Sequence, residues 1–196
     1  MELSRIGELI GSPSVLGDPE VDWVGVEAQL GVNLPDDYKA FVSAYGSGEF
    51  METLMLFHPR GRAGDEGLNL FDLWRSTSET YEHLSRSGGD VPPIPVYPDP
   101  FGAVPIARSI SGNVLFLVPP RNAGEVWSVA MDMGEWLLFE AGFTDFLWEA
   151  LQGGVHPVLD GEIGFEQIGV LDDGNGCGRS CRSATGVVAG GGIIGR

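Results

Sequence analysis

The sequence predicts a single α+β domain in which helices pack around a mostly antiparallel sheet. Three observations lead to this fold class. Apolar residues recur at helical spacing in 18–46, four apolar runs separated by short turns follow in 103–141, and an amphipathic stretch at 143–152 closes the pattern. With 196 residues, the chain is long enough for one well-cored domain, and two would be cramped.

The first helix of the domain is expected to start at Asp18-Pro19, because Asp can cap a helix and Pro tolerates its first position. An apolar stripe that includes Trp23 runs along one side of this helix, and Gly31 is placed to end it. Residues 1–17 precede the helix as a weakly amphipathic lead-in, which we place outside the domain.

The second helix is the most tightly specified stretch of the chain. Pro35 suits its first turn, and Gly46 is placed to end it. Gly48 then allows a tight turn into one or two strands within 49–57. The apolar face of this helix is formed by Tyr38, Phe41, Val42 and Tyr45, at positions i, i+3, i+4 and i+7.

The rest of the domain reads as a helix, a connector, a meander and a closing helix. A third helix is expected within 68–89, and five prolines in nine positions make 92–100 an extended connector. Thr144 is the candidate cap of the closing helix and Gly153 its end. The strand candidates are 103–110, 114–118, 125–131 and 135–141, whose short links favour antiparallel neighbours.

The last part of the chain differs in composition. We place the domain at 18–154 and interpret 155–196 as a weakly ordered, glycine-rich tail, flexible after about Leu171. Its cysteines, Cys177 and Cys181, are the only two of the chain and form no disulfide framework.

The charge of the chain restricts its partners. The formal net charge is −17, from 28 acidic and 11 basic residues. Such a surface repels phosphate backbones, which argues against nucleic-acid binding, and it attracts a basic partner. An acidic surface kept only for solubility is the alternative. We see no secretory signal and no long apolar run, so we expect a cytoplasmic protein that does not insert into membranes.

A search for catalytic and metal-binding motifs finds little. The three histidines, His58, His83 and His156, have no partner at a metal-ligand spacing, and Cys177-x-x-x-Cys181 has no second ligand pair. No phosphate loop and no nucleophile elbow are present. We therefore expect no catalytic residues, no metal and no cofactor.

An ordered set of residues resembles the N-terminal signature of the SUKH superfamily, which includes a fungal cell-wall regulator and many bacterial toxin-immunity proteins. The resemblance covers about 18–152 and implies a curved, mostly antiparallel sheet in a single domain without catalytic residues. The residues that carry it most clearly are Trp23, Leu34, Pro35, Tyr38, Phe41, Gly46 and Gly48.

The resemblance implies a non-enzymatic immunity protein that neutralises a basic toxin domain, such as a nuclease or deaminase, by occlusion and charge complementarity. A SUKH-type regulatory or scaffold protein in a pathway such as cell-wall synthesis is the alternative. A small hydrolase that uses the pairs Glu49/Glu52 or Asp132/Glu135 is a third hypothesis. The expected partner-binding residues are Glu49, Glu52, Asp65, Glu66, Asp132 and Glu135, although each alone could be a solvated loop charge.

Overall fold

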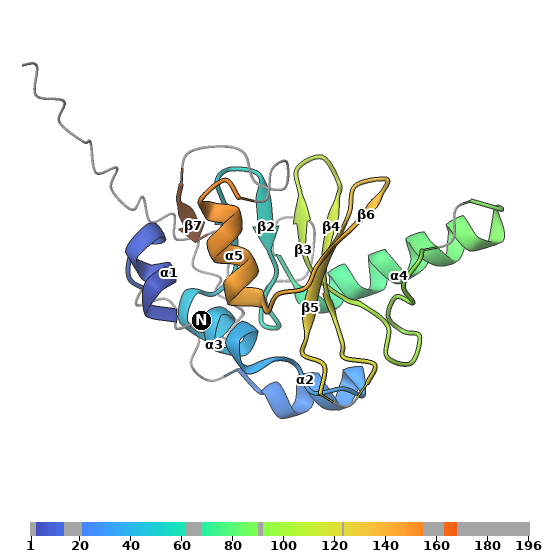
Figure 1. Cartoon of the computed structure of the whole chain (residues 1–196). Coiled ribbons are helices and arrows are strands. Elements are labelled where there is room, and N and C mark those ends of the chain that lie inside the picture. The colour runs from blue at the N-terminus through green and yellow to red at the C-terminus, as the bar shows by residue number, and fades with distance from the viewer. Residues whose placement is uncertain are drawn as a thin grey trace, which may run out of the picture.

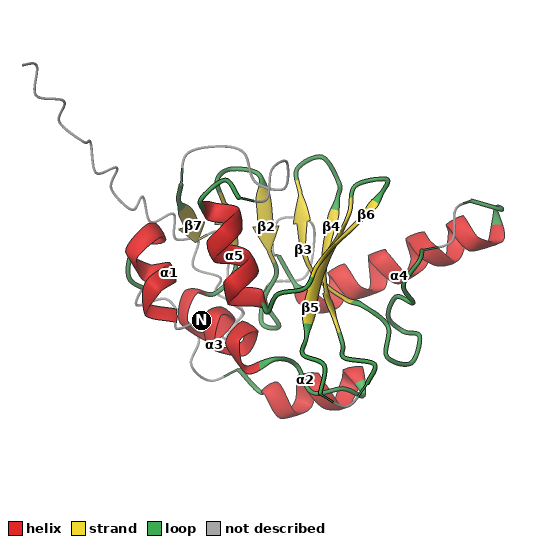
Figure 2. Cartoon of the chain, in the orientation of Figure 1, coloured by secondary structure: helices red, strands yellow, loops and turns green. Residues whose placement is uncertain are grey.

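An open antiparallel sheet of seven strands lies at the centre of the part of the chain that the structure describes (Figures 1 and 2). The structure is a computed structural model. It confirms the predicted α+β class, with five helices around the sheet among the described residues. The described residues are 3–13, 21–61, 68–89, 92–122, 124–154 and 163–167.

The helices and strands alternate in short groups along the chain. The helices are α1 (Leu3–Ile10), α2 (Trp23–Leu30), α3 (Asp36–Tyr45), α4 (Leu70–Arg86) and α5 (Phe143–Leu151). The strands are β1 (Gly48–Phe50), β2 (Leu54–Leu56), β3 (Val104–Ser109), β4 (Val114–Val118), β5 (Ser128–Asp132), β6 (Trp136–Phe139) and β7 (Phe165–Gln167).

The strands are arranged in the order β6-β5-β4-β3-β2-β1-β7. All neighbouring pairs are antiparallel, so β3 to β6 form the predicted meander, and β6 and β7 are the two edges. The turns β1–β2, β3–β4 and β5–β6 lie at one end of the sheet (Figure 1). We call this end the turn end; the β4–β5 loop and the start of α5 lie at the opposite end.

The two faces of the sheet carry different layers. One face packs against α1, α3 and α5 and forms the main core, which includes Phe41, Leu56 and Phe146. The other face is covered by α4, whose Tyr81 belongs to a smaller cluster around Phe116. Residues that pair directly across strands share a face. The register therefore fixes which predicted surface residues look toward α4.

The second helix of the domain is confirmed as α3. Its predicted apolar face is entirely buried, and Gly46 closes it with a positive φ of 73°. Pro35 precedes the helix at the N-cap position, with extended backbone, and does not lie in the first turn. A difference of one residue is within the usual disagreement over where a helix begins, so the predicted start of this helix agrees with the structure.

The first helix of the domain starts later than predicted. Its N-cap is Asp22, whose side chain accepts a hydrogen bond from the N–H of Gly25, and its first residue is Trp23. Asp18 and Pro19 lie outside the described residues. The predicted end at Gly31 is confirmed, with a left-handed φ of 72°.

Gly48 has a different role from the predicted one. It is the first residue of β1, and a Cβ added there would lie 2.3 Å from the ring of Phe165 and 2.6 Å from the carbonyl oxygen of Glu166. The residue has to be glycine because β7 packs against it, and not because the chain turns there.

Strand β7 was not predicted. Residues 163–167 follow the domain boundary that the sequence suggested, yet they extend the sheet by pairing with β1 and add Phe165 to the core. The helix α1 also packs on the core, with Ile6 fully buried. The expectation of flexibility after about Leu171, and those for Cys177 and Cys181, fall on residues outside the described ranges.

Candidate partner-binding surfaces

The predicted partner-binding residues fall into two groups on the sheet. Glu49 is in the middle of β1 and Glu52 is exposed in the β1–β2 turn, whereas Asp132 ends β5 and Glu135 is exposed in the β5–β6 turn. The two groups share the turn end, but β4, β3 and β2 separate β5 from β1. Four interstrand spacings amount to about 19 Å.

The remaining two predicted residues, Asp65 and Glu66, lie outside the described residues. Whether any of the six contacts a partner stays a prediction.

Glu49 lies directly opposite a like charge. It pairs across the strands with Glu166 of β7, so both carboxylates lie on the face that α4 partly covers. Partial burial raises the pKa of Glu49, and the neighbouring charges of Glu166 and Glu52 raise it further. Glu166 was missed from the sequence, because only the pairing of β1 with β7 brings it to Glu49.

The turn that carries Glu52 has an unusual backbone. Met51 and Glu52 have φ values of 50° and 54°, and the N–H of Thr53 donates to the carbonyl of Phe50 at 3.0 Å. Two positive φ values define the type I′ turn of hairpins, which favours Asn and Gly. The turn buries the side chain of Met51 and exposes that of Glu52.

Asp132 is engaged within the domain. The hydroxyl of Tyr81 on α4 donates a short hydrogen bond to one carboxylate oxygen, and the N–H of Gly134 donates to the other at 3.0 Å. Burial raises the pKa of the Tyr81 phenol well above its usual value, and Asp132 adds to the shift. Asp132 therefore helps to hold α4 on the sheet.

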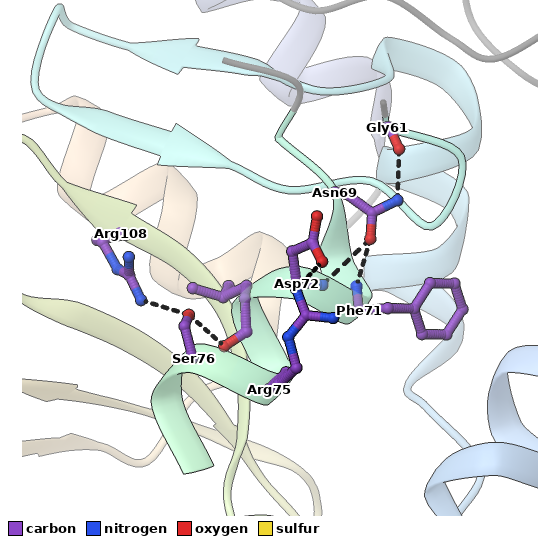
Figure 3. A network of polar contacts seen from close by, with 8 residues as sticks. Gly61, Asn69, Phe71, Asp72, Arg75, Ser76 and Arg108 are labelled. Carbon is purple, nitrogen blue, oxygen red and sulfur yellow. Dashed lines mark hydrogen bonds and ion pairs between the residues drawn. The ribbon is translucent and has the colours of Figure 1, made fainter. Parts of the chain in front are cut away.

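The start of α4 is tied to the sheet by polar contacts (Figure 3). The amide oxygen of Asn69 accepts hydrogen bonds from the N–H groups of Phe71 and Asp72, which caps the helix. The guanidinium of Arg108 on β3 donates to the hydroxyl of Ser76 at 3.1 Å. Arg108 lies in the same cross-strand row as Glu49, two strands away, and its side chain reaches toward α4.

A groove of about 710 Å³ lies at the opposite end of the sheet. Its walls come from the end of α2 and the α2–α3 loop, the first turn of α3, the β4–β5 loop and the start of α5. None of the four described partner-binding residues predicted from the sequence lines it. Its lining includes Glu27, Asn33, Asp36, Asp37, Lys39, Glu125, Val126, Trp127 and Asp145.

The charged residues of the groove are held by the fold. Glu27 accepts hydrogen bonds from the N–H of Leu34 at 2.9 Å and from the ammonium of Lys39 at 2.8 Å. Lys39 also pairs with Asp36 at 3.0 Å. Burial alone would lower the pKa of Lys39, but its bonds to the two carboxylates outweigh this and raise it.

Glu125 supplies another fixed negative charge. Hydrogen bonds from the Asn122 side chain, followed by those from the backbone N–H groups of Arg121 and Asn122, lower the pKa of Glu125. The carboxylate therefore stays ionised while it shapes the β4–β5 loop. These hydrogen bonds of Glu125 could not be predicted from the sequence, because they form only when the loop folds back on itself.

The described part of the chain contains neither a cluster of metal-ligating side chains nor a membrane-spanning helix. No group of three or more potential metal-ligating side chains comes together in those ranges. No described helix is long and apolar enough to cross a membrane.

The fold and its surfaces define an α+β domain with acidic surface sites at both ends of an open sheet. Residues 19–149 match the model of the SMI1 / KNR4 family (SUKH-1), a span of 131 of the 196 residues. The chain belongs to this family, as the resemblance in the sequence indicated. Proteins of this family are of immunity or SMI1/KNR4 type and generally interact with protein partners. No curated protein and no solved structure matched the chain.

Proposed function

We propose that the protein is an immunity protein that binds a basic toxin domain, such as a nuclease or deaminase, and neutralises it by covering its active cleft. The observation that carries this proposal is the pairing of Glu49 with Glu166 at the turn end of the sheet. Membership of the SMI1 / KNR4 family supports the general class.

The pair has a physical consequence for binding. Like charges placed directly opposite each other across two strands destabilise the sheet. Partial burial is the largest cause of the raised pKa of Glu49, and the repulsion from Glu166 adds to it. A basic side chain from a partner, placed between the two carboxylates, would remove the repulsion. Binding would then gain both the new ion pairs and the relief of the old repulsion.

The overall charge supports the same kind of partner. A net charge of −17 accelerates the encounter with a basic protein and disfavours competing acidic ones. Toxins that act on nucleic acids present basic clefts to their substrates. An acidic protein seated on such a cleft blocks it by occlusion, without any catalytic group of its own.

The test is co-purification with a basic toxin domain encoded by a gene that neighbours the gene for this protein. We expect a stable complex with the wild-type chain and an at least tenfold weaker one with the double variant Glu49→Gln/Glu166→Gln. Glu79→Gln, on the exposed part of α4, is the matched control and should bind as wild type. The affinity should also fall steeply between about 50 and 500 mM salt.

Two outcomes would contradict the proposal. Tight binding that neither salt nor the double variant changes would rule out charge complementarity at this site. A chain that neither binds nor protects against the neighbouring toxin would instead favour a regulatory or scaffold protein, the other role that the family includes.

A further inference from the structure

The groove between α2, α3, the β4–β5 loop and α5 has no part in the function proposed above. It is about 710 Å³ in volume, which is large enough for several side chains of a partner and too large for one ion. We propose that this groove is a docking site for a segment of a partner protein that presents an arginine next to an apolar side chain.

The charge of the groove selects a basic occupant. Five carboxylates and one ammonium line it, which leaves a formal charge of −4. The ammonium, that of Lys39, is already bonded to Glu27 and Asp36. Asp36 remains almost fully exposed in spite of this bond, with 99% of its side chain accessible. The negative charge is spread along the walls, a pattern that suits a segment of polypeptide.

The groove also has an apolar side. Val126 is 74% exposed at its edge, and the half-buried ring of Trp127 follows it. An exposed valine beside an aromatic ring is a contact surface for an apolar side chain. An inorganic cation or a purely charged chain would leave this side unused.

Arginine fits both sides of the groove better than lysine. Its planar guanidinium can form paired hydrogen bonds with a carboxylate and can stack on an indole ring. Asp36 and Trp127 offer these two kinds of contact in one groove. A lysine ammonium would provide a point charge without the planar contact.

The groove lies far from Glu49 and Glu166. The five residues of β5 separate the β4–β5 loop from the turn end, which corresponds to about 17 Å. The two sites can therefore be tested separately, and docking in the groove does not require the partner to be a toxin.

The experiment is an NMR titration of the isotope-labelled full chain with the capped peptide Gly-Leu-Arg-Leu-Gly. We expect the largest shifts at the backbone amides of Asn33, Val126 and Asp145 and at the indole of Trp127. Peptides in which the arginine is replaced by glutamine, or both leucines by glycine, should bind at least fivefold more weakly.

Variants of the chain locate the site. Val126→Ser and Asp36→Asn should each weaken binding of the peptide about fivefold, because they remove an apolar contact and a charge. Val24→Ser is the matched control, since Val24 is 78% exposed on α2 and is not among the residues that line the groove. Glu79→Gln controls for the loss of one surface charge. Both controls should bind as wild type.

Three results would overturn the inference. They are shifts centred on β1 and β7, shifts spread evenly over the acidic surface, and equal binding of the wild type and the Val126→Ser variant. If the peptide binds in the groove but the toxin test fails, the docking site stands without the immunity function. If the chain neutralises the toxin normally but its groove binds no peptide, the immunity function stands without the docking site.

Discussion

The carboxylate of Asp37 on α3 caps α5, with Oδ2 accepting hydrogen bonds from the backbone N–H of Thr144 at 3.0 Å and from its hydroxyl at 3.1 Å. Gly142 is the N-cap residue of α5 and offers no side chain, so the prediction that Thr144 caps the helix is wrong. A residue 107 positions away satisfies the free N–H of the first turn instead.

Replacement of Asp37 by alanine should therefore destabilise the fold. We expect a loss of about 1–2 kcal/mol in the free energy of unfolding, in the upper range for an N-cap, because two hydrogen bonds are lost. Urea unfolding at pH 7 measures it. The neighbouring substitution Asp36→Ala removes an exposed ion pair with Lys39 and should cost less than about 0.5 kcal/mol. Equal effects of the two changes would contradict the capping role.

The strained hairpin turn should separate stability from binding. Glu52→Gly relieves a positive φ that costs a non-glycine residue about 1–2 kcal/mol, while glycine loses about 0.5–1 kcal/mol through chain entropy. We expect a net stabilisation of about 0.5 kcal/mol, measured by urea unfolding. Binding of the basic partner should weaken, because the carboxylate is gone.

The matched variant for this turn is Glu52→Gln, which removes the charge and keeps the strain. It should weaken binding to the same extent and gain less stability than Glu52→Gly, because it relieves only the repulsion between Glu52 and Glu49. A Glu52→Gly chain that is less stable than wild type would show that the turn is not strained.

The stability of the protein should depend on Glu49 and on pH in a definite direction. The folded state raises the pKa of this carboxyl group, so between the unfolded and folded values the folded protein binds more protons. Stability contributed by the neutral form is then lost as the pH rises through this window. The Glu49→Gln variant has no carboxyl group at this position, so it does not lose stability in this way.

We therefore expect Glu49→Gln to be more stable than wild type by about 0.2–1 kcal/mol at pH 7, the range for cross-strand pairs. The difference should shrink toward zero as the pH falls through the raised pKa of Glu49, because the wild-type carboxyl group then becomes protonated and loses its charge. Unfolding in urea across this pH range measures both. A difference that grows on acidification would have the wrong sign.

Two buried tyrosines of α3 should respond differently to loss of their hydroxyl groups. Tyr38 is fully buried, and its hydroxyl has no hydrogen-bond partner among the described residues, whereas the Tyr45 hydroxyl donates to the carbonyl of Gly11 at 2.9 Å. Tyr38→Phe should be neutral or stabilising, because it removes an unsatisfied buried group. Tyr45→Phe should cost about 0.5–1.5 kcal/mol. Thermal unfolding of the two variants and the wild type measures both changes in stability.

The parts of the fold that the sequence predicts are those whose signals are local. The buried face of α3 repeats within ten residues, and the turns that separate β3 to β6 follow each strand directly. Both patterns depend on neighbours in the chain, so one sequence is enough to recognise them.

The parts that were missed depend on residues far apart in the chain. The glycine at position 48 is explained only by Phe165, and the cap of α5 only by Asp37. The same applies to the candidate sites. Glu166 lies opposite Glu49 only because the three-residue strand β7 pairs with β1, and the groove is formed from three separate stretches of the chain, 27–39, 125–127 and 142–145. A list of acidic residues could not show which of them meet.

The pairing of β1 with β7 also bears on the order in which the sheet assembles. The hairpins of the meander join residues that are close in the chain, whereas Glu49 and Glu166 are 117 positions apart. Contacts between distant residues carry a larger loop-closure cost and tend to form late. During synthesis, the outer edge of β1 stays unpaired until β7 has been made and pairs with it. That interval exposes a strand edge to aggregation until the sheet is completed.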